Sequence, residues 1–282
     1  MKKILFLMMA LVLTLPILTG QSVEAAAKGR ILLVASSQRT MTLKDGSQMD
    51  VGFYLNELAV PAQYLAQQGY EIVMATPSGE RPVMDAGSNQ AKFFGGNEAA
   101  RAQAQAFTEK LPVISLAKAD EELGSFDALF IPGGHAPMTD LMQNAELGTA
   151  LRYFHEQKKT TAAICHGPVA LLAALPQAAQ LRQTIAADDV NGAQTAAKDW
   201  IYAGYQMTML SDLEEWPGEL HKGTQMPFHI EQALQMAGGT IVNDGMYKSH
   251  VIHDRELITG ENPQSDLALA KEIDQALQKK QK

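Results

Sequence analysis

The single cysteine of the chain carries the clearest chemical signal in the sequence. Cys165 follows the apolar run 160–164 and precedes Gly167-Pro168, after which a second apolar stretch begins. This order predicts a strand, a sharp turn and a helix, with the thiol on the turn and His166 beside it to exchange a proton. The backbone N–H groups at a helix start favour a thiolate. We therefore predict a cysteine nucleophile, although a lone cysteine is often only a small buried side chain.

Three further segments, together with the one around Cys165, resemble a known family. Residues 162–168 resemble the nucleophile elbow of the ThiJ/PfpI superfamily, whose fold is similar to that of class I glutamine amidotransferases. The other matching segments, in the order of the family, are 52–58, 130–135 and 254–265. The long form of the chain, with an insert after the second strand, is most similar to the branch of heat-shock chaperones and glutathione-independent glyoxalases.

The resemblance implies roles for residues on two of these segments. Glu57 matches a family glutamate that lies against the nucleophile, where an apolar cleft would raise its pKa and let it carry protons. Gly133 and Gly134 match a turn whose backbone N–H groups, with that of His166, could bind a substrate oxygen. His135 could contact substrate or be structural. From the residues alone, Glu57 would equally suit a helix N-terminus, and the glycines a plain tight turn.

The acid that orients His166 is expected in the segment 211–216. By the resemblance, Asp212 and Glu215 are both candidates for this role, and Glu214 is expected to face solvent. The alternative is an ordinary helix start, with a capping residue followed by acidic residues in the first turn.

A second histidine segment, residues 228–231, is superficially similar to the His-Pro-Glu motif of amidotransferases. It reads Phe-His-Ile-Glu, without the proline, and it leads into a helical pattern. The apolar stripe of that helix is Ile230, Ala233, Leu234 and Ala237. The stripe predicts a packing helix, so we treat the match of His229 and Glu231 as accidental.

Strand-like and helix-like segments alternate along the chain. Apolar runs predict buried strands at 30–36, 71–75, 127–131 and 160–164, and helices are expected at 60–68, 98–108, 141–157, 228–236 and 265–278. This alternation predicts an α/β fold, and with the resemblance a flavodoxin-like sandwich with a mostly parallel central sheet, helices on both faces and a nucleophile elbow. Sites in such sheets lie beyond the carboxyl ends of the strands, which gathers Glu57, the Gly133-Gly134 turn and Cys165.

Two stretches toward the C-terminus are predicted in more detail. Residues 200–205 fit a strand or an irregular surface segment equally well, and 206–210 fit a strand. The last helix is expected to pack through Leu267, Ala270, Ile273 and Leu277.

Residues 1–27 have the pattern of a secretory signal peptide. Two lysines precede an apolar stretch that ends near Leu18, and small residues at 23–27 offer cleavage sites. The stretch is short for a membrane span of ~20 residues and a proline interrupts it, so cleavage is favoured over a retained anchor. We expect residues 28–282 to form one ThiJ/PfpI-like domain, secreted or periplasmic and without a stable membrane anchor.

The composition narrows the classes of partner. The chain has 23 Lys and Arg against 31 Asp and Glu, a formal net charge of −8, which argues against a nucleic-acid partner. The seven histidines show no His-x-x-x-His pair, and residues 80–125, where some relatives bind zinc, contain no His or Cys. We therefore predict no metal and no other cofactor. The resemblance implies a homodimer.

The resemblance also implies an enzyme that acts on small aldehydes. Cys165 would attack a 2-oxoaldehyde such as methylglyoxal, Glu57 and His166 would shuttle protons, and water would release a 2-hydroxy acid without glutathione. This activity is that of a glyoxalase III-type lyase, and removal of such aldehydes from protein adducts would use the same thiol. One alternative is a non-enzymatic stress protein, either a holdase chaperone or a thiol oxidant sensor. Another is an amidotransferase or peptidase-like hydrolase.

Overall fold

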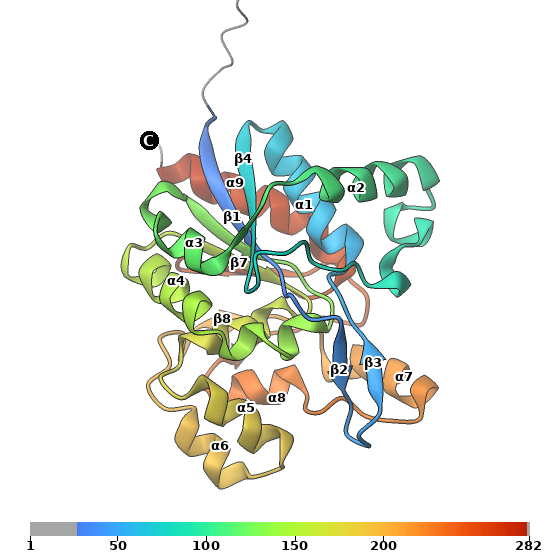
Figure 1. The fold of residues 1–282 in the computed structure, drawn as a ribbon, viewed down its shortest axis with the longest axis vertical. Coiled ribbons are helices and arrows are strands. Elements are labelled where there is room, and N and C mark those ends of the chain that lie inside the picture. Colours follow the sequence, from blue (N-terminus) through green and yellow to red (C-terminus); the bar gives the residue numbers. More distant parts are fainter. Residues whose placement is uncertain (1–26, 281–282) are drawn as a thin grey trace, which may run out of the picture.

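A seven-stranded sheet forms the centre of the protein (Figure 1). This computed structural model describes residues 27–280, so the predicted signal peptide, apart from Ala27, lies outside the described residues. The strands lie in the order β10-β11-β7-β6-β1-β4-β5, and all pair in parallel except β10, which is antiparallel to β11. Their bounds are β1 Gly29–Val34, β4 Tyr70–Thr76, β5 Val113–Ser115, β6 Ala128–Ile131, β7 Thr160–Ile164, β10 Val251–Asp254 and β11 Leu257–Gly260. The predicted α/β fold with a mostly parallel sheet is confirmed.

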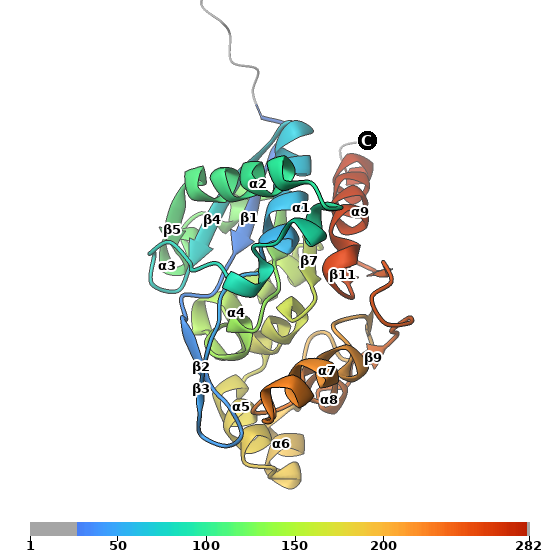
Figure 2. The ribbon, with the colours of Figure 1, turned by 90° about the vertical axis from the view of Figure 1, so that its right-hand side faces the viewer.

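Helices cover both faces of the sheet, which explains why its central strands are apolar throughout. In β1, Ile31 and Leu33 pack into one hydrophobic core and Leu32 and Val34 into the other, because alternate residues of a strand point to opposite faces. One face is covered by α1 Leu55–Gln67, α2 Glu98–Lys110 and α9 Asp266–Lys280, and the other by α3 Leu116–Asp120 and α4 Ala145–Glu156 (Figure 2). The predicted strands and helices of this sandwich are all present, although α1 begins five residues earlier than the sequence indicated.

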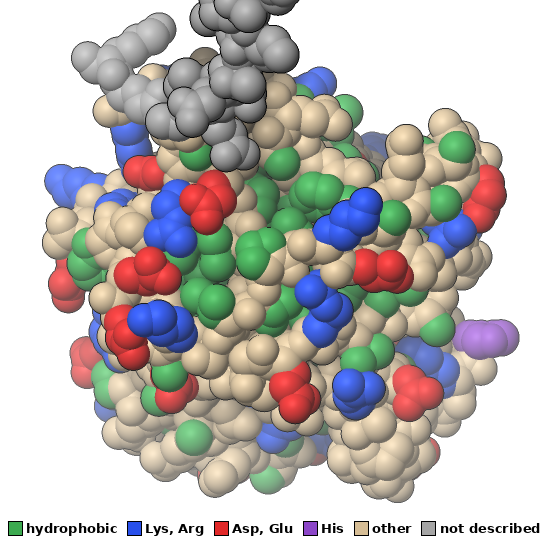
Figure 3. Space-filling model, turned by 45° about the horizontal axis from the view of Figure 1, so that its top comes forward, with side chains coloured by type: hydrophobic (Ala, Val, Ile, Leu, Met, Phe, Trp, Pro, Cys, Tyr) green, Lys and Arg blue, Asp and Glu red, His purple; other side chains and the backbone are tan. Residues whose placement is uncertain are grey.

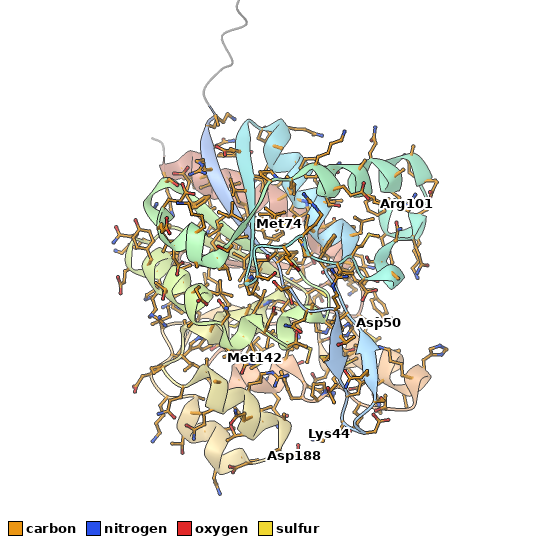
Figure 4. The ribbon with its side chains drawn as sticks, viewed as in Figure 1. Lys44, Asp50, Met74, Arg101, Met142 and Asp188 are labelled. Atoms are coloured by element: carbon orange, nitrogen blue, oxygen red, sulfur yellow. The ribbon has the colours of Figure 1, made fainter. Side chains whose placement is uncertain are left out.

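Smaller elements lie beyond the carboxyl ends of the strands, in the lower part of Figures 1 and 2. They comprise β2 Thr40–Thr42, β3 Gln48–Asp50, α5 Ala178–Ala186, α6 Val190–Ala196, β8 Gln206–Met207, α7 Asp212–Lys222, α8 Ile230–Met236 and β9 Thr240–Ile241. Figure 4 shows Lys44, at the turn between β2 and β3, reaching toward Asp188, at the turn between α5 and α6, and their charged groups lie 2.6 Å apart. Elements far apart in sequence therefore meet in this region.

Short 3-10 helices connect the larger elements. They are η1 Ala86–Ser88, η2 Ala91–Phe94, η3 Leu123–Ser125, η4 Ala136–Met138, η5 Leu141–Gln143, η6 Gly167–Ala174 and η7 Pro263–Ser265. Among them, η6 is the helix that follows Cys165, and η2 belongs to the insert.

Two details differ from the sequence-based expectations. Residues 200–205 form turns rather than a strand, and only Ala203 and Gly204 are exposed, whereas Trp200 is buried and its indole N–H donates to the Leu171 carbonyl at 2.9 Å. In α9, Ala270, Ile273 and Leu277 are buried as predicted, whereas Leu267 is 42% exposed and Leu269 is buried.

On the face shown in Figure 3, acidic and basic side chains are interspersed rather than segregated. Within the described residues, no helix has the length and hydrophobicity needed to cross a membrane.

Candidate active site

The turn after β7 holds Cys165 in a strained backbone conformation. Its φ angle is +59°, in the left-handed region that non-glycine residues seldom adopt. Two backbone hydrogen bonds fix this turn, because the Cys165 N–H donates to Gly260 at 2.9 Å and its carbonyl accepts from Leu210 at 3.0 Å. The geometry is that of a nucleophile elbow, as the strand–turn–helix pattern predicted, and it leaves the residue only 4% exposed.

Glu57 lies against this cysteine from the first turn of α1. The side chain is completely buried, and neither carboxylate oxygen has a hydrogen-bond partner of good geometry in the described structure. Gly133 leaves the space for it, since a Cβ atom there would collide with both the Glu57 carboxylate and Cys165. Burial raises the pKa of Glu57 well above its usual range, which favours the protonated carboxyl.

The thiol is not simply activated by the helix start. Burial raises the pKa of Cys165, and an ionised Glu57 would raise it further, whereas the Gly134 N–H acts in the opposite direction. The sequence-based argument for a thiolate left out this desolvation. Glu57 and Cys165 therefore compete for a single negative charge, and a base near the sulfur is needed to take the thiol proton.

His166 is placed to be that base. Its Nδ1 lies 3.4 Å from the Cys165 Sγ, and its Nε2 lies 2.6 Å from the Glu215 Oε2. A carboxylate on Nε2 holds the proton there and leaves the Nδ1 lone pair toward the sulfur. Burial, and the neighbouring His135, lower the pKa of His166, which keeps the imidazole neutral and able to accept a proton.

Glu215 binds a second histidine as well. The His135 Nε2 lies 3.1 Å from Glu215 Oε1, and the His135 and His166 rings lie 4.2 Å apart between centroids. Burial by itself would raise the pKa of Glu215, but the two histidines outweigh it and hold the pKa well below its usual range. The structure thus places His135 as a partner of Glu215 at the wall of the site.

The other acidic candidate, Asp212, does not reach His166. Its carboxylate lies 3.3 Å from the His229 Nδ1, and its backbone N–H donates to Glu231 at 3.2 Å. The His229 Nε2 binds Glu219 instead of the thiol, at 3.1 Å. His229 and Glu231 are therefore engaged in joining α7 to α8, and they do not form a triad with the cysteine.

Glu214 is buried, contrary to the expectation that it faces solvent. It forms a capping box with Ser211 and accepts hydrogen bonds from the Tyr247 N–H at 2.7 Å and from Asn262 at 2.9 Å. The two consecutive glutamates of α7 thus both point inward, one to hold the loop around Tyr247 and one to hold the histidines.

A cavity of about 520 Å³ opens onto the cysteine. Of the predicted site residues it is lined by Glu57, Gly134, His135, Cys165, His166 and Glu215. Sequence reasoning missed the residues that complete the wall, among them Tyr54, Lys92, Phe93, Gly218, Lys222 and Tyr247. Tyr54 had a signal, because it lies one helical turn before Glu57, and so did Gly218 and Lys222, which follow Glu215 on the same face of α7. Lys92, Phe93 and Tyr247 come from segments with no motif.

The cluster of His135, His166 and Glu215 also has the donor set of a metal site. One ligand atom from each lies within 4.8 Å of the others. The spacing of the histidines along the chain did not reveal this trio, because the fold, not the sequence, brings it together. A metal ion there would displace the Glu215–His166 hydrogen bond that sets the imidazole tautomer.

Comparison with known proteins identifies a family domain in the chain. Residues 48–184 match the model of the DJ-1/PfpI family. The protein contains a DJ-1/PfpI family domain. The ThiJ/PfpI resemblance inferred from the sequence is thereby confirmed.

Known proteins are similar to this chain over most of its length. It is 24% identical to the protein/nucleic acid deglycase HchA of Pseudomonas aeruginosa, over 86% of this chain and 78% of that protein. It is 25% identical to the HchA of Escherichia coli, over 86% of this chain and 79% of that protein. Among solved structures, the Rapid Encystment Protein 24 KDa of Francisella tularensis has a TM-score of 0.67 at 25% identity, with 88% of this chain and 99% of that chain covered. Glyoxalase III of Candida albicans shares the fold, with a TM-score of 0.61 at 20% identity over 88% and 97% of the two chains.

Proposed function

We propose that this DJ-1/PfpI protein is a cysteine-dependent enzyme that converts small 2-oxoaldehydes such as methylglyoxal into 2-hydroxy acids, or removes them from protein adducts. The observation that carries the proposal is the placement of two proton carriers beside one thiol. His166 Nδ1 lies 3.4 Å from the sulfur with its tautomer set by Glu215, and the buried Glu57, whose pKa is raised, lies against the same cysteine.

Attack on the aldehyde begins the reaction. The Cys165 sulfur bonds to the aldehyde carbon, and the thiol proton passes through His166 Nδ1 to the aldehyde oxygen, which gives a hemithioacetal. The Gly134 N–H, which lies by the sulfur, is placed to stabilise charge on the oxygen as it forms.

An internal transfer of hydrogen follows. His166 Nδ1 takes the proton from the aldehyde carbon while Glu57 gives its proton to the ketone oxygen, and an enediol forms. Return of the His166 proton to the second carbon, with return of the hydroxyl proton to Glu57, leaves a thioester of the 2-hydroxy acid. Water then breaks the carbon–sulfur bond and the thiol regains its proton, so one water is consumed and no oxidant is needed.

Relatives named as deglycase and as glyoxalase III support this choice of reaction class within the family. The test is a glutathione-free assay on purified residues 28–282, in which loss of methylglyoxal and formation of the 2-hydroxy acid are measured together. Cys165→Ser should abolish both, with unchanged circular dichroism and melting. Equal turnover by Cys165→Ser would overturn the proposal. Absence of turnover in a folded wild type would favour the chaperone alternative.

We also propose that the protein is exported. The basic start, apolar stretch and small residues of positions 1–27 support this. The mass of the mature N-terminus and the cell fraction that contains it test the proposal, and a full-length chain confined to the cytoplasm would contradict it.

A further inference from the structure

Two lysines stand at the mouth of the active-site cavity without an acidic partner. Lys92 lies in η2 and Lys222 at the end of α7, and both line the cavity while their side chains are exposed. Across residues 27–280, no carboxylate forms an ion pair with either of them. The Lys92 ammonium instead lies 4.8 Å from the centroid of the Phe93 ring. In a chain with a net charge of −8, two unpaired cations at one opening call for an explanation.

The acidic groups of the cavity wall are engaged elsewhere. Glu215 is bound by two histidines and Glu214 by the capping box and Asn262, and burial raises the pKa of Glu57. Neither Glu214 nor Glu215 forms an ion pair with Lys92 or Lys222, so both ammonium groups remain available to an anionic ligand.

The charge of Lys222 also reaches the reacting groups. Its side chain contributes to lowering the pKa of His166, after burial and His135. On α7, Glu215, Gly218 and Lys222 follow at spacings of three and four, so they share the face that lines the cavity. This face of α7 therefore extends from Glu215, which binds His166, to Lys222 at the opening of the cavity.

The cavity is also larger than a three-carbon aldehyde requires. Its volume of about 520 Å³ is within the range of ~300–1,000 Å³ that is typical of sites for drug-sized ligands. Its walls include Tyr54 and Phe93, whose rings pack edge to face at 5.0 Å, and Tyr247. Aromatic walls with cations at the opening fit an extended ligand that has an apolar middle and an anionic end.

We propose that the cavity takes a 2-oxoaldehyde, or an adduct of one, whose end distant from the reacting carbonyl carries a carboxylate or phosphate bound by Lys92 and Lys222. The chemistry assigned to the reacting end of this ligand rests on the function proposed above. The assignment of the anionic end does not, because it depends only on the two lysines and the shape of the cavity.

A matched pair of thiol reagents tests the anion site independently of turnover. Iodoacetate and iodoacetamide alkylate the same thiolate and differ in charge, and Cys165 is the only cysteine, so intact mass reports its rate directly. The ratio of the iodoacetate rate to the iodoacetamide rate should fall about fivefold in Lys222→Gln or Lys92→Gln, equivalent to ~1 kcal/mol, and further in the double variant. Lys110→Gln removes the same charge from the end of α2, outside the cavity, and should leave the ratio unchanged.

Two further experiments identify the chemistry of the ligand. Added inorganic phosphate and benzoate, tested separately, should slow alkylation by iodoacetate in the wild type and not in the double variant, and the stronger competitor indicates which anion is preferred. The wild type should also turn over 4-carboxyphenylglyoxal with a higher kcat/KM than phenylglyoxal, a preference that the double variant loses.

The outcomes separate the two proposals. An alkylation ratio that is the same in the wild type and the double variant would overturn the anion site, whatever the protein does to aldehydes. A ratio that falls in the lysine variants, in a protein that turns over no aldehyde, would support the anion site and refute the reaction.

Discussion

The Nε2 atom of His166 lies 2.6 Å from the Oε2 atom of Glu215, although one residue belongs to the nucleophile elbow and the other to α7. This contact fixes the imidazole so that Nδ1 faces the thiol. It also links the position of α7 to the reactivity of Cys165, because a displacement of the helix would break the hydrogen bond that holds the His166 proton on Nε2.

Glu215→Gln should lower kcat/KM for methylglyoxal by 10-fold or more, or ~1.4 kcal/mol of transition-state stabilisation, because a neutral amide no longer holds the proton on Nε2 or stabilises the imidazolium. Asp212→Asn is the matched control on the same helix, since Asp212 pairs with His229 and should change kcat/KM less than twofold. Steady-state kinetics on both variants decide between the two acids. A loss confined to Asp212→Asn would contradict the structure.

Glu57→Gln should lower kcat by about 10²- to 10⁴-fold, the usual contribution of a general acid or base, because the amide fills the same space but cannot exchange a proton. Alkylation of Cys165 by iodoacetamide should persist in this variant, because the thiol and His166 are retained. A turnover rate near that of the wild type would mean that Glu57 serves only as a residue of the first turn of α1.

The sequence predicted those parts of the site that lie within a single motif. Cys165 and His166 are adjacent in the chain, and the order of strand, turn and helix specifies the elbow locally. Glu57 and Gly133 were found through the family resemblance, since nothing within either segment points to the cysteine. The choice of Glu215 over Asp212 needed the structure, because which of two acids on one helix turns inward depends on how α7 packs.

The same limit explains the errors elsewhere in the chain. Glu214 is polar and its neighbours are acidic, so a sequence argument places it in solvent, whereas its hydrogen bonds come from Tyr247 and Asn262, which lie far along the chain. In α9 the predicted stripe is correct from Ala270 onward, and only its first member, Leu267, is exposed, because packing against α1 and β11 buries Leu269.

His229 predicts a pH dependence of stability. Its hydrogen bond to Asp212 and its contact with Glu219 raise its pKa to about 9, against the effect of burial. Since the folded pKa lies above the unfolded value of about 6.5, this stabilisation is complete below pH 6.5 and is lost as the pH rises through 9. The side chain is 30% exposed, so we expect roughly 1 kcal/mol rather than the full effect of the shift.

Thermal melts of the wild type and His229→Gln at several pH values test this expectation. The Tm of the wild type should exceed that of the variant by about 2–4 °C at pH 6, and the two should converge near pH 10. A difference that is constant from pH 6 to pH 10 would show that His229 contributes packing and not charge.

Gly218→Ala should raise stability and lower activity toward large substrates. Glycine within a helix costs about 1 kcal/mol relative to alanine, and a Cβ atom at this position would meet nothing within 4 Å, so the helix gains stability without strain. Because residue 218 lines the cavity between Glu215 and Lys222, the same methyl group narrows the path of an extended ligand. We expect Tm to rise by about 2–4 °C, while kcat/KM falls about 10-fold for 4-carboxyphenylglyoxal and less than twofold for methylglyoxal. Equal changes for the two aldehydes would show that Gly218 does not leave room for the distal end of the substrate.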